Sequence, residues 1–216
     1  AGSTASTEFM RSKGRGDDAL RSLGGPVWIL RPGLVIGRAA YGGTALLRML
    51  AAVPGLQPMA LGQVPVQSVA VQEVAGAVVA AVGGNLPPGE YDLVEEEPQT
   101  LHQVVDETRK WLGFAPARMT LSLPLWLVRQ VGNMADLLGR LGWRSPIRST
   151  AIQVLEEGIR GDPEPYRRAA GQALSPLPVI YAGLPSGPEH RLAARMALMM
   201  PVAVAVLSMF WLISGL

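Results

Sequence analysis

A lysine and an aromatic ring share one face of a predicted helix near the start of the chain. Phe9 and Lys13 are four residues apart, which places them one turn from each other on a helix. The Lys13 ammonium can donate hydrogen bonds, whereas a phenyl ring has no proton to give. A β-branched and aromatic run at 27–30 then leads into Arg31-Pro32-Gly33. This order predicts a helix, a buried strand and a loop.

The elements behind this segment predict a small alternating α/β domain. Apolar periodicity and Gly/Pro breaks predict helices at 44–53, 73–82, 124–141 and 150–159, and extended segments at 61–71, 91–94 and 119–123. Thr100 is expected to cap an amphipathic helix. Its apolar side would carry Leu101, Val104, Val105, Thr108, Trp111 and Leu112, and its polar side Glu107, Arg109 and Lys110.

The C-terminal end is more apolar than the rest of the chain. Hydrophobic residues make up 49% of the sequence and charged residues 17%, and the apolar excess is concentrated at 196–216, where no charged residue occurs. At ~1.5 Å per residue this run is long enough to cross ~30 Å of hydrocarbon. Arg191 and Arg195 precede it, so the positive-inside rule places the preceding domain in the cytoplasm. A buried core helix is the alternative, although the run has no polar stripe.

Several classes of function are not supported by the composition. The chain has no cysteine, so it has neither a disulfide framework nor a thiolate metal site. His102 and His190 show no ligand spacing, and we expect no metal. A formal net charge of +2, without basic runs that alternate with aromatics, argues against a nucleic-acid partner.

The order of these segments resembles the second half of the nucleotide-binding domain in extended and atypical short-chain dehydrogenases. These are epimerase- and dehydratase-like proteins related to the dehydrogenase-like accessory subunit of respiratory complex I. In that family a helix carries Tyr-x-x-x-Lys and the next strand ends in Arg-Pro. In this sequence Phe9 stands at the tyrosine position, Lys13 at the lysine position, and Arg31-Pro32 at the end of the strand. The segment at 68–75 resembles the family's Val-His-Val-x-Asp-Val-Ala, with Ala70 and Glu73 at the histidine and aspartate positions. The segment at 89–94 resembles Gly-x-Tyr-Asn-Leu.

The resemblance implies a fold and a site. The fold would be the C-terminal half of a Rossmann-like doubly wound α/β domain, with a small α/β substrate-binding part. In the family the lysine binds the ribose hydroxyls next to the nicotinamide and lowers the pKa of the tyrosine. Lys13 would keep the first role. Arg31, Pro32 and Gly33 would lie beside the cofactor, with Arg31 chiefly a structural residue at the end of the strand, and Tyr41 would line the substrate cleft.

The cofactor would be NAD or NADP, but a glycine-rich phosphate turn is missing. Such a turn lets backbone N–H groups at a helix N-terminus bind the pyrophosphate. Neither Gly-x-Gly-x-x-Gly nor Gly-x-x-Gly-x-x-Gly occurs in the sequence, and Gly14-Arg15-Gly16 follows no strand. We therefore expect the phosphate-binding half, and the family's active-site serine, to precede Ala1. This piece alone would then bind the dinucleotide at millimolar concentrations or more weakly.

The segments at 141–146 and 210–216 resemble bacterial oxidoreductases of this family that are fused to a DoxX-like membrane module. On this basis we expect three parts: the second half of the dehydrogenase-like domain at 1–123, a helical extension and linker at 124–190, and a transmembrane helix at 191–216. The protein would lie in a bacterial inner membrane, with membrane lipid and other membrane redox components as partners.

Two functions remain open. One is a membrane-anchored NAD(P)-dependent oxidoreductase, which the DoxX-like link favours. The other is a catalytically silent nucleotide-binding or assembly subunit of a membrane redox complex, which Phe9 favours.

Overall fold

The computed structural model describes residues 8–140, 152 and 155–215. The elements in chain order are α1 (Glu8–Arg21), β1 (Trp28–Pro32), β2 (Leu34–Ile36), α2 (Gly43–Ala51), β3 (Leu56–Met59), β4 (Pro65–Val66), β5 (Ser68–Ala70), α3 (Val71–Val82), β6 (Gly89–Leu93), β7 (Gln99–Thr100), α4 (Leu101–Trp111), β8 (Met119–Ser122), α5 (Leu125–Arg140), α7 (Glu164–Ala170), α8 (Leu177–Ala182) and α9 (Pro188–Ser214).

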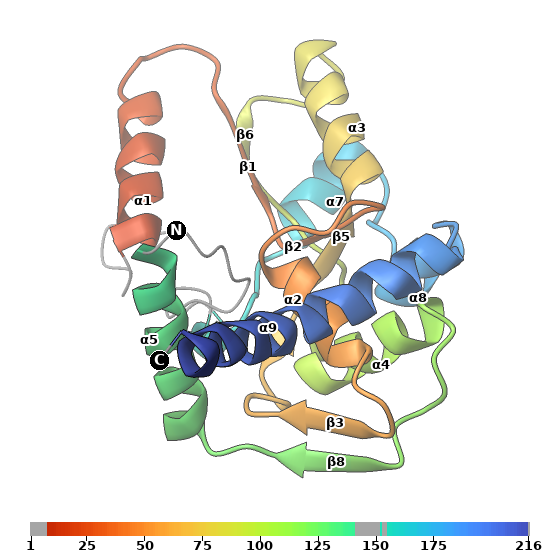
Figure 1. The fold of residues 1–216 in the computed structure, drawn as a ribbon. Helices are drawn as coiled ribbons and strands as arrows, with labels where there is room; N and C mark the ends of the chain where they lie inside the picture. Colours follow the sequence, from red (N-terminus) through yellow and green to blue (C-terminus); the bar gives the residue numbers. More distant parts are fainter. Residues whose placement is uncertain (1–7, 141–151, 153–154, 216) are drawn as a thin grey trace.

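Parallel strand pairs with helices on both sides organise the first part of the molecule. β1 pairs with β6 and β2 pairs with β5, both in parallel. α1 lies on one side of the β1–β6 pair, and α3 and α7 lie on the other (Figure 1). This is the α/β arrangement with parallel strands that the alternating pattern predicts, because parallel strands need helical crossovers that cover both faces.

Gly33 separates β1 from β2 and marks a change of pairing partner. The Gly33 N–H donates to Leu93 O at 3.0 Å, at the end of β6, and the next N–H, of Leu34, donates to Gln67 O at 2.9 Å, beside β5. The chain that leaves β6 then reaches β5 as well, since Glu95 N–H donates to Ser68 O at 2.9 Å. The carboxyl ends of β1 and β6 therefore meet at this point.

Two apolar clusters form the interior. One contains Val69, Ala77, Leu86 and Leu93, with Tyr91 and Tyr166 in an edge-to-face contact at 6.2 Å between ring centroids. The other surrounds Val104 and Val105 of α4 and includes Leu177, Ile180 and Tyr181 of α8. Both clusters combine side chains from 1–123 with side chains from 166–184, so the helical extension packs into the body.

The predicted cap and apolar side of helix α4 are confirmed, and the predicted position of Arg109 is wrong. The Thr100 hydroxyl accepts a hydrogen bond from Gln103 N–H at 3.2 Å, and Leu101, Val104, Val105, Thr108 and Leu112 are buried. The placement of Arg109 on the polar side is wrong, because its side chain is only 4% exposed. Its guanidinium donates to the carbonyl oxygens of Ala51, Val53 and Ala115 at 2.6–3.0 Å, which offsets the cost of burying the charge.

The predicted helices at 44–53, 73–82 and 124–141 correspond to α2, α3 and α5, and the strands at 91–94 and 119–123 to β6 and β8. The extended segment at 61–71 contains two short strands, β4 and β5. β3 was not predicted. It is a short strand with Pro58 inside, and it pairs with β8 alone among the described strands. Of the predicted helix at 150–159, residues 150, 151, 153 and 154 lie outside the described residues. Residues 152 and 155–157 are helical, whereas Ile159 is extended and forms a β-bridge with Val66.

Helix α9 begins in the body and ends in an exposed apolar run. Ala194 is buried, the His190 ring lies 5.3 Å from the Trp111 ring, and the Arg195 guanidinium lies over the Phe114 ring at 5.2 Å. Beyond these turns the helix is long and apolar enough to cross a membrane, and its most apolar window is not buried. It is the only such helix in the described part of the chain.

Candidate functional site

A cleft of about 900 Å³ opens between α1 and the carboxyl ends of β1 and β6. Lys13 and Asp17 line it from the helix, and Arg31, Pro32 and Gly33 line it from the end of β1. In open α/β sheets, ligands bind outside the carboxyl ends of the strands. The four residues for which a cofactor contact was predicted, Lys13, Arg31, Pro32 and Gly33, thus line one cavity at the place where the fold would hold a ligand.

Helix α1 presents a charged face to this cleft. Lys13 is exposed and is four residues before Asp17, so the two side chains lie on the same face one turn apart. The backbone of Phe9 lies one further turn toward the N-terminus, inside α1, whereas its side chain is outside the described part of the structure. An ammonium group at this position can donate to hydroxyl or phosphate oxygens of a ligand in the cleft.

Arg31 joins α1 to the sheet. Its Nη2 lies 2.9 Å from Asp17 Oδ2 and 2.6 Å from Glu90 Oε2, and its Nη1 lies 3.8 Å from Asp92 Oδ1. Asp17 and Glu90 accept hydrogen bonds from Nε and Nη2, whereas Nη1 lies only at ion-pair distance from Asp92. Through these contacts Arg31 connects α1 to the strand ends.

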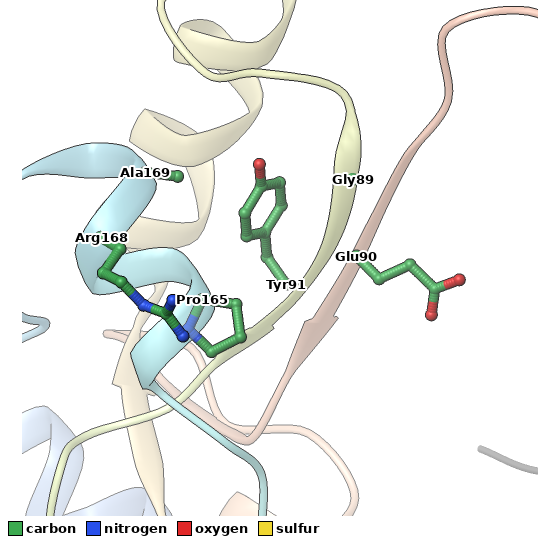
Figure 2. Close-up of a pocket in the computed structure, with 6 residues that line it drawn as sticks. All are labelled: Gly89, Glu90, Tyr91, Pro165, Arg168 and Ala169. Atoms are coloured by element: carbon green, nitrogen blue, oxygen red, sulfur yellow. The ribbon is translucent and has the colours of Figure 1, made fainter.

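Glu90 is the second connection between α1 and the sheet. Figure 2 shows its side chain pointing away from that of Tyr91, so the two residues face opposite sides of β6. On the α1 side, Glu90 accepts hydrogen bonds from Arg21 Nε at 2.5 Å and from Arg31 Nη2 at 2.6 Å. These bonds, from Arg21 first and then from Arg31, lower the pKa of Glu90 to about 2.

We expect α1 to loosen from the sheet in acid. The pKa of Glu90 is lower in the folded chain than the ~4.3 of a free glutamate, so its contribution to the attachment is complete above pH ~4.5 and is lost as the pH falls toward 2. A fluorophore on Ala19→Cys, a unique thiol because the chain has no cysteine, should become more mobile across this range. Glu90→Gln should be mobile already at pH 5. An equal anisotropy–pH profile in both chains would contradict the role of Glu90.

Glycines on the cleft floor allow the strands to approach each other closely. A Cβ on Gly33 would lie 2.5 Å from Gln67 O and 2.9 Å from Val94 Cγ1, and a Cβ on Gly161 would lie 2.7 Å from Asp92 Cβ. Gln67 fastens this floor, because its Oε1 accepts from Gly161 N–H at 2.8 Å and its Nε2 donates to Glu95 O at 2.7 Å.

Some residues of the cleft were not predicted from the sequence, and one residue expected in a cleft lies outside this one. Asp17, Asp92, Arg160 and Gly161 line the cleft without having been predicted. Only Asp17 had a local signal, the i+4 spacing from Lys13. Tyr41, expected in the substrate cleft, is 81% exposed and is not among the lining residues, because it precedes α2 at the surface.

A smaller hollow of about 440 Å³ lies between β6 and α7, lined by Tyr91, Pro165 and Arg168 (Figure 2). Among residues 8–140, 152 and 155–215, no group of three or more His, Asp or Glu side chains could hold a metal ion.

Solved structures share this fold. No protein-family model matches the chain, and no curated protein matches it by sequence. An NADPH-dependent quinone oxidoreductase from Escherichia coli, complexed with NADPH, is 18% identical with a TM-score of 0.53, over 77% of this chain and 56% of that one. The enzyme WbmF of Bordetella bronchiseptica, in complex with NAD+, is 14% identical with a TM-score of 0.52, over 93% and 58%. A human epimerase family protein with NADPH is 22% identical with a TM-score of 0.50, over 73% and 48%.

At these identities the likeness establishes the fold alone. The chain spans about half the length of the structures that it matches. Its parallel strand pairs and covering helices are thus those of a Rossmann-like α/β fold, which these NAD(P)-complexed oxidoreductases and epimerases share.

Proposed function

We propose that this chain is the nicotinamide-side half of an NAD(P)-binding oxidoreductase of the short-chain dehydrogenase type, anchored in a membrane by α9. The observation that carries the proposal is the convergence of Lys13, Arg31, Pro32 and Gly33 on one cleft at the carboxyl ends of β1 and β6.

In this proposal the cleft residues predicted from the sequence have different roles. The Lys13 ammonium binds the ribose hydroxyls of NAD or NADP. Arg31, held by Asp17 and Glu90, keeps α1 at the distance from the strand ends that this contact needs. Pro32 bends the end of the strand toward the nicotinamide, and Gly33, which has no side chain, lets the backbone come close to it. The cofactor supplies the hydride chemistry, and the chain supplies binding and orientation.

The silent nucleotide-binding subunit remains a second candidate because of Phe9. A phenyl ring at the tyrosine position has no proton to transfer, so turnover would need another donor.

The proposal also has a membrane part. Helix α9 would begin a DoxX-like module in a bacterial inner membrane, and the body would lie on the cytoplasmic side, next to Arg191 and Arg195. Lipid and other membrane redox components would be its partners.

Cofactor binding by the intact protein tests the proposal. Lys13→Ala should weaken NADPH or NADH binding about 10- to 100-fold in a fluorescence titration, because one charged hydrogen bond contributes ~1.5–3 kcal/mol. Arg15→Ala is the matched control: it removes a charge from the same exposed helix, outside the residues that line the cleft. Equal affinities in Lys13→Ala and the parent protein would remove this assignment of the cleft.

Phe9→Tyr distinguishes the two candidates. It places a phenol one turn from Lys13, whose charge would lower the pKa of the phenol. In a silent subunit this change would create slow hydride transfer, whereas in an active enzyme with another proton donor it would alter the pH–rate profile.

A separate experiment tests the anchor. The full chain should resist carbonate extraction, and a chain that ends at Arg195 should not. The cut follows Arg195 because the first two turns of α9 pack on Trp111 and Phe114 of the body. Extraction of both chains would contradict the membrane span.

A further inference from the structure

An imidazole lies between a carboxylate and a hydroxyl where α4 meets β8. His102 Nε2 lies 3.1 Å from Thr120 Oγ1 of β8. His102 Nδ1 lies 3.2 Å from Asp106 Oδ2, one turn further along α4. The two ring nitrogens therefore face different partners, a hydroxyl on one side and an acid on the other. None of these three residues lines the cleft at the ends of β1 and β6.

The partners of His102 determine which ring nitrogen of the neutral imidazole carries the proton. A carboxylate beside Nδ1 favours the proton on that nitrogen, so Nε2 is left as an acceptor. The Thr120 hydroxyl then donates to Nε2. A hydroxyl in this position can pass its proton to the ring while its oxygen attacks an electrophile. The same relation of acid, base and hydroxyl occurs in hydrolases with unrelated folds, where it is recognised by geometry and not by sequence position.

Regular secondary structure holds the ring and the hydroxyl in place. The His102 N–H donates to Gly62 O at 3.0 Å, next to the Thr100 cap that begins α4. β8 is held by its parallel pairing with β3 over all four of its residues. Figure 1 shows the two strands as a separate pair next to α4.

The Thr120 hydroxyl is open to a ligand. Thr120 is exposed, and β8 pairs with β3 alone among the described strands. The Leu123 N–H donates to Met59 O at 2.7 Å. By alternation along the strand, the Leu121 N–H also faces β3 and the Thr120 N–H faces the open edge. An acyl oxygen at this edge can accept from that N–H, as it does from the N–H of the nucleophile in serine hydrolases.

A buried amide without partners lies beside the hydroxyl. Gln57 is paired with Thr120 across β3 and β8, so the two side chains lie on the same face of the strand pair. Gln57 is 1% exposed, and neither its Oε1 nor its Nε2 has a hydrogen-bond partner among the described residues. Such a group destabilises the fold, and its presence needs an explanation. A ligand oxygen bound at Thr120 would offer the amide an acceptor.

We propose that Thr120, His102 and Asp106 form a second reactive site, which transfers the acyl group of small carboxylic esters to water. This inference does not depend on the proposed cofactor site. Thr120 is the nucleophile and His102 the general base. Asp106 is a positioning residue, because it acts through the imidazole. The exposed strand edge offers a substrate few contacts, so we expect small, activated esters to react best.

The reaction has two steps and needs no other reactant than water. First, Thr120 Oγ1 forms a bond to the ester carbonyl carbon while its proton moves to His102 Nε2. The ester C–O bond then breaks, and His102 gives the proton to the leaving alcohol oxygen. Second, water attacks the acyl carbon and gives a proton to His102. That proton returns to Oγ1 as the bond between the acyl group and Thr120 breaks, and the carboxylic acid is released.

The detergent-solubilised full chain is tested with p-nitrophenyl acetate. We expect a burst of p-nitrophenolate and an acetyl group on Thr120, found in the tryptic peptide that runs from Met119 to Arg129. Thr120→Val keeps the shape without the hydroxyl and should abolish the burst, whereas Thr120→Ser should keep it. Ser122→Ala is the matched control. Ser122 is also exposed and lies two residues along on the same face of β8, so this variant should react as the parent does.

Three further variants test the roles around the hydroxyl. His102→Gln should slow the acetylation of Thr120 by ~100-fold or more, because a positioned general base contributes ~10²–10⁴-fold. Asp106→Asn should also slow it, and Asp106→Glu should recover part of that loss by restoring a carboxylate to the same turn. Gln57→Leu should raise the unfolding temperature and yet lower the acetylation rate, a split that a structural glutamine would not give.

Two results would overturn the proposal. Equal rates of Thr120 acetylation in His102→Gln and the parent would show that His102 only joins α4 to β8. A burst that persists in Thr120→Val, with the acetyl group on other side chains, would show that the hydroxyl is not the nucleophile.

Discussion

Replacing Glu95 by alanine should destabilise the detergent-solubilised chain by ~3–5 kcal/mol, the cost expected when one partner of a buried charged network is removed. Glu95 is 1% exposed, and its carboxylate accepts four hydrogen bonds. Oε1 accepts from the Ser68 N–H at 2.8 Å and the Ser68 hydroxyl at 2.6 Å, and Oε2 accepts from Leu177 N–H at 3.0 Å and Gln99 Nε2 at 3.1 Å. Alanine would leave these donors buried without an acceptor.

The position of Glu95 explains the size of the effect. It follows β6 and joins that strand to β5 through Ser68 and to the start of α8 through Leu177, which are 27 and 82 residues away in the sequence. Glu95→Gln keeps the shape but turns one acceptor into a donor, which would face either the Ser68 or the Leu177 N–H. We expect a smaller loss of ~1–3 kcal/mol, the cost of one unsatisfied buried group.

Urea denaturation checks both values, with Glu97→Ala as the matched control. Glu97 is exposed and is two residues away in the same acidic run, and a surface substitution of this kind changes stability by at most ~0.5 kcal/mol. Equal unfolding midpoints for Glu95→Ala and Glu97→Ala would show that the carboxylate network does not hold β5, β6 and α8 together.

The acidic run at 95–97 also shows where prediction from sequence stops. All three glutamates follow a strand and have the composition of a solvated loop, and Glu96 and Glu97 are indeed exposed. Glu95 differs only in its tertiary partners, Ser68 and Leu177, which no local pattern connects to it. Arg109 is a similar case: its place on a charged stripe predicted exposure, whereas three carbonyl oxygens at the end of α2 and after α4 bind it in the interior.

Secondary structure was predicted correctly where the conformation depends on residues close together in the sequence. The apolar periodicity of α3, the cap at Thr100 and the short strand β6 all depend on residues within one or two turns, and all three were predicted. The candidate site was predicted in part for the same reason: Lys13 and the Arg31-Pro32-Gly33 strand end are adjacent elements of one motif. Asp92 and Gly161 enter the cleft by long-range packing, which spacing alone does not reveal.

A single added methyl group at Gly33 should have a large effect on both folding and ligand binding. In Gly33→Ala the new Cβ would lie 2.5 Å from the Gln67 carbonyl oxygen, a backbone atom that cannot rotate away, and 2.9 Å from Val94 Cγ1. Overpacking of this kind costs ~1–3 kcal/mol or more. Relief requires β2 and β5 to separate at the point where the chain changes pairing partner, so the cleft floor would move too.

Gly16→Ala is the matched control for this prediction. Gly16 also lines the cleft, but it lies inside α1, and a Cβ there would meet no atom within 4 Å. Alanine in place of a glycine in a helix interior should stabilise the chain by ~0.5–1 kcal/mol. Thermal unfolding should therefore move in opposite directions for the two variants, although each adds one methyl group to the same cavity wall.

Cofactor titration of the intact protein separates the effect on the cleft from the effect on folding. Below its unfolding temperature, Gly33→Ala should bind NADPH or NADH more weakly than the parent, because the strand ends that face the nicotinamide have been displaced. Gly16→Ala should bind as the parent does. Normal affinity in a destabilised Gly33→Ala would show that the close approach to Gln67 serves the fold but does not shape the ligand site, and Gly33 would then lose its place among the cofactor-binding residues.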